Sequence, residues 1–452
     1  MSTCKHLSRL DLRSTVRQLL FNRQLHSCPP PTRSAGSIQR PFGIQPSTCQ
    51  NPGARLHSST AWLSPHPTSR TLCVLSKKSL DSFQRQNHNL ATNQSPNTQQ
   101  TTRRPILYRP PGEPSADQKF QTLTLYTITP IPESQLEDLR EQLFLQLVQY
   151  DITGRIYLAK DGINLHLCTP VEHTESLRSS LQQLVLDPFG KGPDGAIWNV
   201  SCDQPGERVF RKLKVAVKRQ LVADGRLGQW DVHGSESPQY LEPEEFHARL
   251  DEVGDKALLI DMRNHFENEV GTFKTAVKMD CTTFKENMDL MENLLENRDK
   301  SKEVLMVCTG GIRCSVSGRY LKQKGFKDVK MLKGGITSYG RYIKSNPDKK
   351  SHFMGKNFTF DGRRGERITN DVISSCHQCH TPHDDLTNCA NARCHLLFIQ
   401  CPSCRQKWAN TCGPDCHHAV ETGTGPALSK PYDYHAQVRP GELITSKLPE
   451  AA

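Results

Sequence analysis

A cysteine loop is the feature of this sequence that most directly suggests chemistry. The apolar run Val304 to Val307 leads into six consecutive residues: Cys308, Thr309, Gly310, Gly311, Ile312 and Arg313. A helical pattern begins near Cys314, so the loop joins an expected strand to an expected helix. Backbone N–H groups of such a loop point inwards and, with the helix N-terminus, form a cradle for negative charge. A thiolate is stabilised there, so we expect a depressed pKa for Cys308.

The neighbours of Cys308 are expected to support this loop. Gly310 and Gly311 allow the close backbone approach that the loop needs. Arg313 can close the loop by hydrogen bonds or add positive charge. Cys314 stands where the helix starts, and it could either resolve a disulfide or persulfide with Cys308 or have only a packing role. The alternative for Cys308 itself is a buried structural cysteine at the end of a strand.

A second short apolar run, Ala257 to Ile260, ends in Asp261, Met262 and Arg263. Short apolar runs are typical of buried parallel strands. Because ligands of open α/β sheets bind at the carboxyl ends of the strands, we expect Asp261 and Arg263 to support the Cys308 loop. A helix is expected at 283–297, between the two runs. Residues 233–350 are therefore interpreted as an α/β domain with a parallel sheet.

Residues 376–416 contain eight cysteines in four close pairs, namely Cys376 and Cys379, Cys389 and Cys394, Cys401 and Cys404, and Cys412 and Cys416. No apolar signal core begins the chain, and in an intracellular protein this pattern favours metal over disulfides. Four pairs suffice for two structural Cys4 zinc sites. The spacing leaves open which pair joins which. Histidines that could replace a cysteine are His377, His380, His383 and His395. We expect a zinc-binding segment over 351–420.

Residues 119–232 alternate between strand and helix patterns. Strands are expected around 123–126, 155–159, 163–168, 196–200 and 210–218, and helices at 133–149 and 172–185. The order βαββαβ is typical of a ferredoxin-like sandwich. The sequence therefore predicts a mixed α+β and α/β protein of several domains, in which this domain precedes the parallel α/β domain and the Cys-rich segment.

The first 118 residues have the composition of an organellar address. They contain 15 Lys and Arg but only four acids, and Arg outnumbers Lys twelve to three. Arg9, Arg13 and Arg17 recur at helical spacing, as in transit peptides. We expect a disordered transit peptide and linker over 1–118, cleavage near Arg55–Ser59, and location in the mitochondrial matrix. The alternatives are a plastid or a cytosolic tail. A second disordered segment is expected over 421–452.

Two basic clusters could contact nucleic acid. In the expected strand at 210–218, Lys212, Lys214 and Lys218 alternate with apolar residues, which places a basic stripe on one face of a sheet. Such a stripe suits phosphates, although solvated lysines give the same pattern. A second cluster consists of Arg363, Arg364 and Arg367. No run of residues approaches the apolar length that a bilayer crossing needs, so we expect no membrane association.

The Cys308 loop, Asp261–Asn264, Gly271-x-Phe273 and Lys333–Ile336 together resemble a rhodanese domain. A longer ordered set of motifs, covering roughly residues 120 to 416, resembles the rhodanese-containing tRNA uridine 5-hydroxylase family. These motifs are Gly154–Asn164, Leu213–Lys218, Asp261–Glu267, Cys308–Cys314, Gly355–Phe358 and the Cys-rich block. The chain departs from the family pattern at Ser315, Val316, Gly362 and His383. These departures concern substrate choice more than membership.

The resemblance implies that the chain oxidises the wobble uridine of tRNA to 5-hydroxyuridine with molecular oxygen. It also implies that Cys308 is the essential cysteine. An electron donor is required and is unidentified, and the sequence contains no flavin, haem or iron motif. One alternative is a sulfurtransferase that passes persulfide sulfur from Cys308, for example in tRNA thiolation. Another is a non-catalytic RNA-binding module, which the intact Cys308 loop argues against.

Overall fold

The computed structural model describes residues 105–110, 112–190, 195–200, 204–205, 207–256 and 258–423. The predicted transit peptide and most of the predicted linker and of the predicted C-terminal tail lie outside these residues. Within the described part of the chain, no helix is both long and apolar enough to cross a membrane.

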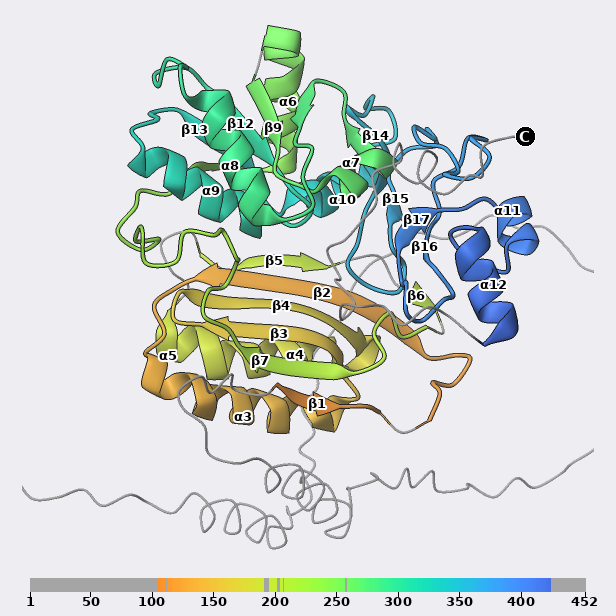
Figure 1. Cartoon of the computed structure of the whole chain (residues 1–452). Helices are drawn as coiled ribbons and strands as arrows, with labels where there is room; N and C mark the ends of the chain where they lie inside the picture. Colours follow the sequence, from red (N-terminus) through yellow and green to blue (C-terminus); the bar gives the residue numbers. More distant parts are fainter. Residues whose placement is uncertain are drawn as a thin grey trace, which may run out of the picture. The chain divides into compact units, whose positions relative to one another are not determined.

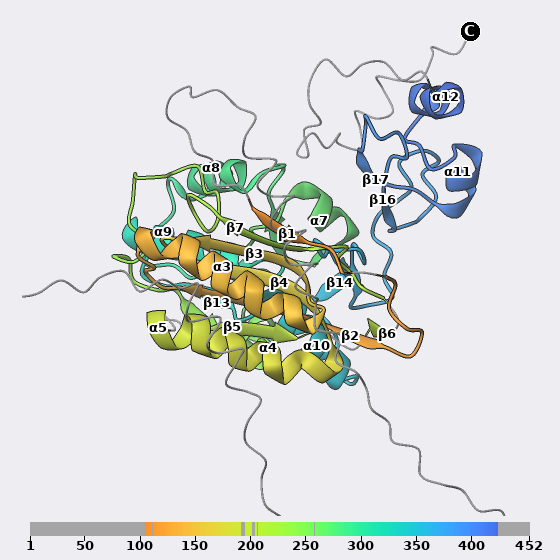
Figure 2. The ribbon, with the colours of Figure 1, turned by 90° about the horizontal axis from the view of Figure 1, so that it is seen from below.

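The first domain is an antiparallel sheet with helices on one face (Figures 1 and 2). Four of its strands have the order β3-β4-β2-β5, which is the ferredoxin-like arrangement expected from the sequence. The chain runs through β2 (Lys119–Ile128), α3 (Leu136–Leu147), β3 (Thr153–Ala159), β4 (Gly162–Pro170), α4 (Thr174–Leu181), the short α5 (Asp187–Phe189) and β5 (Ile197–Val200). Buried leucines of β2 and α3, such as Leu123 and Leu143, form the core between the two layers.

Three further strands extend this sheet. β7 (Leu213–Val217) pairs parallel with β3, β1 (Ile106–Tyr108) pairs antiparallel with β7, and β6 (Gln204–Pro205) pairs with β2. The prediction of a disordered linker through residue 118 is therefore wrong at β1. Three residues carry too little pattern to be recognised as a strand in sequence, and their order comes from backbone pairing with β7.

The second domain has a parallel sheet in the order β11-β9-β12-β13-β8 (Figure 1). The strands are β8 (Gln239–Leu241), β9 (Leu258–Asp261), β11 (Ala276–Lys278), β12 (Val304–Val307) and β13 (Val329–Leu332). The helices are α6 (Pro243–Val253), α7 (His265–Val270), α8 (Phe284–Leu295), α9 (Ile312–Gln323) and α10 (Gly335–Ser345). All four side chains of β12 are buried, as expected for a central parallel strand.

Each face of this sheet has its own core. Met288 and Met291 of α8 pack with Leu321 of α9 against Met306 of β12. On the opposite face, Phe246 of α6 and Ile336 and Tyr339 of α10 pack against Leu305 and Val307. The helices on both faces fix the carboxyl end of β12, where Cys308 lies.

The third segment contains short elements. β14 (Phe353–Asn357) pairs with β10 (Gly271–Phe273) of the second domain and with β15 (Glu366–Arg367), while β16 (Leu386–Asn388) pairs with β17 (Leu397–Ile399). Helices α11 (Pro402–Lys407) and α12 (Pro414–Thr422) follow. α12 continues two residues past the predicted boundary at 420. Most of the buried side chains around α11 and α12 are cysteines, so apolar burial alone does not explain the order of this segment.

Candidate active site and metal centres

Cys308 follows β12 directly, and its sulfur lies inside the loop that precedes α9. The Gly311 N–H donates to the Cys308 Sγ over 3.1 Å. α9 begins at Ile312, two residues before the start suggested by the sequence, so Gly311 is its N-cap with a φ of 104°. A side chain at Gly311 would be strained at that φ, and its Cβ would lie 2.5 Å from the Tyr126 hydroxyl.

The start of α10 keeps the carbonyl groups of the loop away from the sulfur. The Ile336 N–H donates to the Cys308 carbonyl over 2.9 Å, and the Thr337 N–H donates to the Thr309 carbonyl over 3.0 Å. A Cβ at Gly335, which has a φ of 64°, would come within 2.5 Å of the Cys308 carbonyl. With these carbonyls held by α10, the loop can present N–H groups to the thiolate.

The thiol of Cys308 is buried and acidic. Burial raises its pKa, but the hydrogen bond from the Cys314 thiol, the charge of Arg313 and the N–H groups of Cys314 and Gly311 outweigh burial, and the pKa falls to about 6. Burial and the adjacent Cys308 sulfur raise the pKa of Cys314 well above its ordinary value. Cys308 is therefore the thiolate near neutral pH, and Cys314 is a protonated donor to it.

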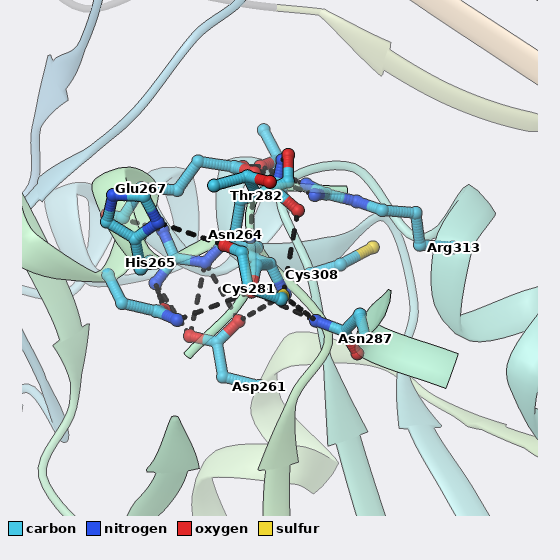
Figure 3. A network of polar contacts seen from close by, with 12 residues as sticks. Asp261, Asn264, His265, Glu267, Cys281, Thr282, Asn287, Cys308 and Arg313 are labelled. Carbon is cyan, nitrogen blue, oxygen red and sulfur yellow. Dashed lines mark hydrogen bonds and ion pairs between the residues drawn. The ribbon is translucent and has the colours of Figure 1, made fainter. Parts of the chain in front are cut away.

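Glu267 organises the other side of the loop (Figure 3). Its carboxylate accepts hydrogen bonds of 2.7 and 2.8 Å from Arg313 and one of 2.8 Å from the Thr309 hydroxyl. Although burial opposes its charge, the charge and hydrogen bonds of Arg313 lower the pKa of Glu267. The sequence prediction omitted Glu267 as a site residue. The available signal was the capping box, since Glu267 is three residues after Asn264, the N-cap of α7.

Asp261 and Arg263 form a fully buried ion pair, with 2.7 Å between Arg263 Nη2 and Asp261 Oδ2. Arg263 also donates to the Gly271 carbonyl and to Asn268. The Met262 N–H continues the ladder to the Val307 carbonyl over 2.8 Å. The Asp261–Arg263 ion pair therefore holds the end of β9 beside Val307, the residue before Cys308. The role of this ion pair is to position the Cys308 loop.

The first domain also contacts the loop, which sequence reasoning did not foresee. Tyr126 of β2 lies 3.0 Å from the Ser315 hydroxyl, and Asn199 of β5 donates to the Gly334 carbonyl over 3.0 Å and to the Gly310 carbonyl over 3.4 Å. Cys308 is only 1% exposed. Cys308 packs in the core of the second domain, and Tyr126 and Asn199 of the first domain contact the residues around its loop.

The eight predicted cysteine ligands gather into two groups of four. Ligand atoms lie within 4.8 Å of one another in each group, which are Cys376, Cys379, Cys401 and Cys404, and Cys389, Cys394, Cys412 and Cys416. The sequence left this pairing open, and the structure joins the first pair to the third and the second pair to the fourth. None of the four histidines considered from the sequence belongs to either group.

The donor sets fit a tetrahedral ion. Four thiolates at the Zn–S distance lie about 3.8 Å apart, and the Sγ–Sγ distances are 3.5 Å for Cys379 and Cys401 and 3.7 Å for Cys394 and Cys412. Backbone N–H groups also point at sulfur, as from Cys412 to Cys389 over 3.4 Å. Such N–H donors support thiolate rather than thiol ligands.

The predicted basic stripe lies on and beside β7. The Lys214 and Lys218 ammonium groups lie 6.0 and 5.2 Å from the centroid of the Tyr157 ring, and Lys212 precedes the strand. Burial and then the charges of Lys218, Arg155 and Lys212 lower the pKa of Lys214. The stripe is therefore a cluster of mutually repelling cations, which an anion would stabilise.

The second basic cluster is mostly engaged in ion pairs. Arg363 donates to the buried Asp361 carboxylate over 2.6 Å, and Arg367 donates to Asp384 over 2.6 Å. Arg363 is mostly buried, so its main contact is the structural pair with Asp361. Arg364 has a φ of 55° and lines a cavity with Lys212 and Lys214. The sequence prediction treated the three arginines alike. It missed the ion pairs of Arg363 and Arg367 with Asp361 and Asp384, because these contacts form only in the folded chain.

Three family models match the chain in succession. They are described as UPF0176 acylphosphatase like domain at residues 120–221, Rhodanese-like domain at 242–341 and Rhodanase C-terminal at 354–417. The three matches lie, in this order, in the first domain, the second domain and the Cys-rich segment.

Among solved structures, a rhodanese-like domain from Anabaena is 20% identical and matches 26% of this chain and 88% of its own, with a TM-score of 0.20. A curated relative from Hamiltonella defensa, named tRNA uridine(34) hydroxylase, is 38% identical over 67% of this chain and 82% of its own length. A relative of the same name from Leptospira interrogans is 35% identical over 72% and 84%. This chain therefore belongs to the tRNA uridine(34) hydroxylase family.

Proposed function

We propose that this protein hydroxylates the wobble uridine of tRNA at C5, with molecular oxygen as co-substrate and Cys308 as the reactive thiolate. One observation carries the proposal: Cys308 lies in the loop between β12 and α9, and the surroundings of this loop lower its pKa to about 6. The names of the bacterial relatives support the substrate and the reaction. A non-catalytic relic of this fold would have no need for a stabilised thiolate.

The chemistry that suits this thiolate is addition to the uracil ring. We propose that the Cys308 Sγ bonds to C6, so that the C5=C6 electron pair makes C5 nucleophilic. Oxygen is delivered at C5, the C5 proton is lost, and the Sγ–C6 bond breaks to restore the ring. In total, uridine and O2 give 5-hydroxyuridine and water, with two electrons and two protons from a separate donor.

Nucleoside analysis of tRNA tests the hydroxylase function. Cells that lack this protein should lose 5-hydroxyuridine, the wild-type gene should restore it, and Cys308→Ser should not. Normal 5-hydroxyuridine with Cys308→Ser would contradict the assignment of the reactive residue.

Addition at C6 has its own test. Without oxygen and in heavy water, the wild-type protein should exchange the C5 proton of its target uridine for deuterium, and Cys308→Ser should not. If hydroxylation proceeds in air while no exchange occurs without oxygen, the addition step is wrong and the hydroxylase function stands.

A sulfurtransferase is the second candidate, because the match to the rhodanese-like domain model includes the Cys308 loop. In that case a sulfur donor such as thiosulfate would leave a persulfide on Cys308. Mass spectrometry of the treated protein, followed by transfer to cyanide or tRNA, would detect it. Sulfur transfer without hydroxylation would favour this second function.

We also propose that both cysteine groups hold structural zinc, since four thiols leave no open position for a substrate. The composition of residues 1–118 supports a further proposal, import into the mitochondrial matrix and removal of a leader of about 57 residues. N-terminal sequencing of the endogenous protein should find a start between roughly residue 55 and β1. An intact Met1 in the cytosol would contradict it.

A further inference from the structure

A cavity of about 490 Å³ lies where the three folded regions meet. β3 and β7 of the first domain contribute Arg155 and Lys214, the second domain contributes Phe266, and the third contributes Phe360 and Leu396. Pockets of this size hold ligands of a few hundred Å³, which includes a nucleotide.

The lining of the cavity is strongly basic. It contains five cationic side chains: Arg155, Arg211, Lys212, Lys214 and Arg364. The one acid in the lining, Asp361, is held by Arg363 and lies 3.2 Å from His166. Within the lining the cationic side chains therefore outnumber the single acid, and a phosphate group is the kind of anion that such a cluster binds.

The lining also contains an exposed aromatic ring. Phe360 is 40% exposed. Its edge contacts are to Phe358, at 5.0 Å between centroids and 87°, and to Phe266, at 6.4 Å and 87°. Two perpendicular neighbours hold the ring in place, so the exposed part of Phe360 has a fixed orientation for a stacking partner. The Arg313 guanidinium, 5.8 Å from the Phe360 centroid, connects this ring to the Cys308 loop.

We propose that this cavity binds one nucleotide of a single-stranded RNA segment, with its phosphate on Lys212, Lys214 and Arg364 and its base stacked on Phe360. A base can stack on a protein ring only after it leaves its own pair, so the site selects unpaired RNA. The inference rests on the proposed function for its choice of RNA. In this arrangement the first domain and the Cys-rich segment both contact the RNA strand beside the Cys308 loop.

The Cys-rich segment has a direct part in this site. Asn388, His395, Leu396 and Leu397 line the cavity. Asn388 precedes Cys389, His395 and Leu396 follow Cys394, and Leu397 is the first residue of β17. The second cysteine group therefore holds one wall of the cavity in place. This gives the proposed zinc a purpose beyond the stability of its own segment.

The test is binding of two labelled probes, a uridine-containing single-stranded oligoribonucleotide and a duplex of the same length. Phe360→Ala should weaken single-strand binding by roughly fivefold to a hundredfold, the usual range for loss of one stacked base. Leu145→Ala, which removes a 55% exposed apolar side chain of α3, should leave binding unchanged.

Charge variants test the phosphate side. Lys212→Ala with Lys214→Ala should weaken binding and reduce its salt slope by about 1.4 at most for a single strand. Lys218→Ala should have a smaller effect, because Lys218 is absent from the cavity lining. Lys160→Ala removes one positive charge from an exposed lysine in the turn after β3, and it is the control for Lys218→Ala. Fast alkylation of Cys308 in every variant would show that the loop remains folded.

Equal affinity for the single strand and the duplex, or normal binding by Phe360→Ala, would overturn the proposal and leave only a basic surface. These outcomes are separate from failure of the proposed function. If the Phe360→Ala variant makes 5-hydroxyuridine at the normal level, the nucleotide site is wrong and the hydroxylase function stands. A protein that binds single-stranded RNA as expected but never hydroxylates it refutes the hydroxylase and keeps the site.

Discussion

The Tyr126 hydroxyl of β2 lies 3.0 Å from the Ser315 hydroxyl in the first turn of α9. The same Ser315 oxygen is 2.8 Å from the Tyr240 hydroxyl and 3.2 Å from the Gly311 carbonyl. A serine hydroxyl has one proton and two lone pairs. If its proton goes to Gly311, both tyrosines donate to Ser315, and Tyr126 thereby ties the first domain to the Cys308 loop.

Tyr126→Phe should therefore make Cys308 more accessible. Loss of one hydrogen bond, worth about 0.5–1.5 kcal/mol, should increase the fraction of molecules in which the first domain has moved off the loop. Alkylation of Cys308 by iodoacetamide at pH 8 should accelerate by roughly two- to tenfold. Tyr240→Phe is the matched control, since it removes a hydroxyl from Ser315 within the second domain. An equal acceleration by both variants would argue against an interdomain role.

The pH dependence of Cys308 alkylation should follow its lowered pKa. The thiolate predominates above the pKa of about 6 and is protonated below it, so the rate should fall as the pH drops through 6. Cys314→Ala removes a hydrogen bond to the thiolate and should shift the midpoint upwards.

Two other buried thiols outside the metal groups serve as internal references. Burial raises the pKa of Cys168 to about 11 and that of Cys281 to about 12, so both should react slowly at pH 7. Cys308→Ser should abolish the fast reaction. An unchanged midpoint in Cys314→Ala would show that the backbone N–H groups and Arg313 suffice.

Asp361 should make stability sensitive to acid. Burial opposes its charge, but the hydrogen bonds from His166 and Arg363 hold the pKa of Asp361 well below its usual range. A depressed pKa contributes stability above the unfolded-state pKa, near 4, and this contribution is lost as the pH falls. Asp361→Asn leaves Arg363 without its partner and should cost about 3–5 kcal/mol at pH 7.

Thermal unfolding between pH 3 and 7 measures this effect. The difference in stability between the wild type and Asp361→Asn should shrink as the pH drops below about 4. Asp348→Asn, at an exposed position, is the control. A difference that is independent of pH would mean that the carboxylate charge of Asp361 is not the source of the stability.

Metal content should separate the two cysteine groups. The purified protein should contain about two zinc ions, and either Cys376→Ser or Cys389→Ser should reduce this to about one. Because the second group holds a wall of the cavity, Cys389→Ser should weaken RNA binding more than Cys376→Ser does. Metal analysis and the single-strand binding assay give the two readouts. Zinc-free protein with an unchanged melting temperature would reject a structural metal.

The sequence predicted the Cys308 loop and the eight metal-ligand candidates because both are local patterns. A strand, a glycine pair and a helix follow each other along the chain, and each pair of cysteines is separated by a few residues. The βαββαβ order of the first domain was predictable for the same reason, since periodicity over ten residues distinguishes strands such as β2 from helices such as α3.

The remainder of the site depends on contacts that no local pattern contains. Glu267 looks like an ordinary helix-capping residue until the fold places it against Arg313, 46 positions away. Arg363 looks like a phosphate ligand until its pair with Asp361 is buried against His166 of β4. The joining of cysteine pairs was also unreadable, because one close pair of thiols is chemically the same as another.

The alternation of the two cysteine groups along the chain has a consequence during synthesis. The first four cysteines of the segment to leave the ribosome are Cys376, Cys379, Cys389 and Cys394, which belong to two different groups. Four thiols are a complete donor set for the proposed zinc, so if these groups hold the metal, a nascent chain that meets zinc early can close a wrong site before Cys401 is made. Metal that arrives after Cys416 has been made meets both correct sets at once. The timing of metal supply relative to translation should therefore influence how much of the protein reaches its native state.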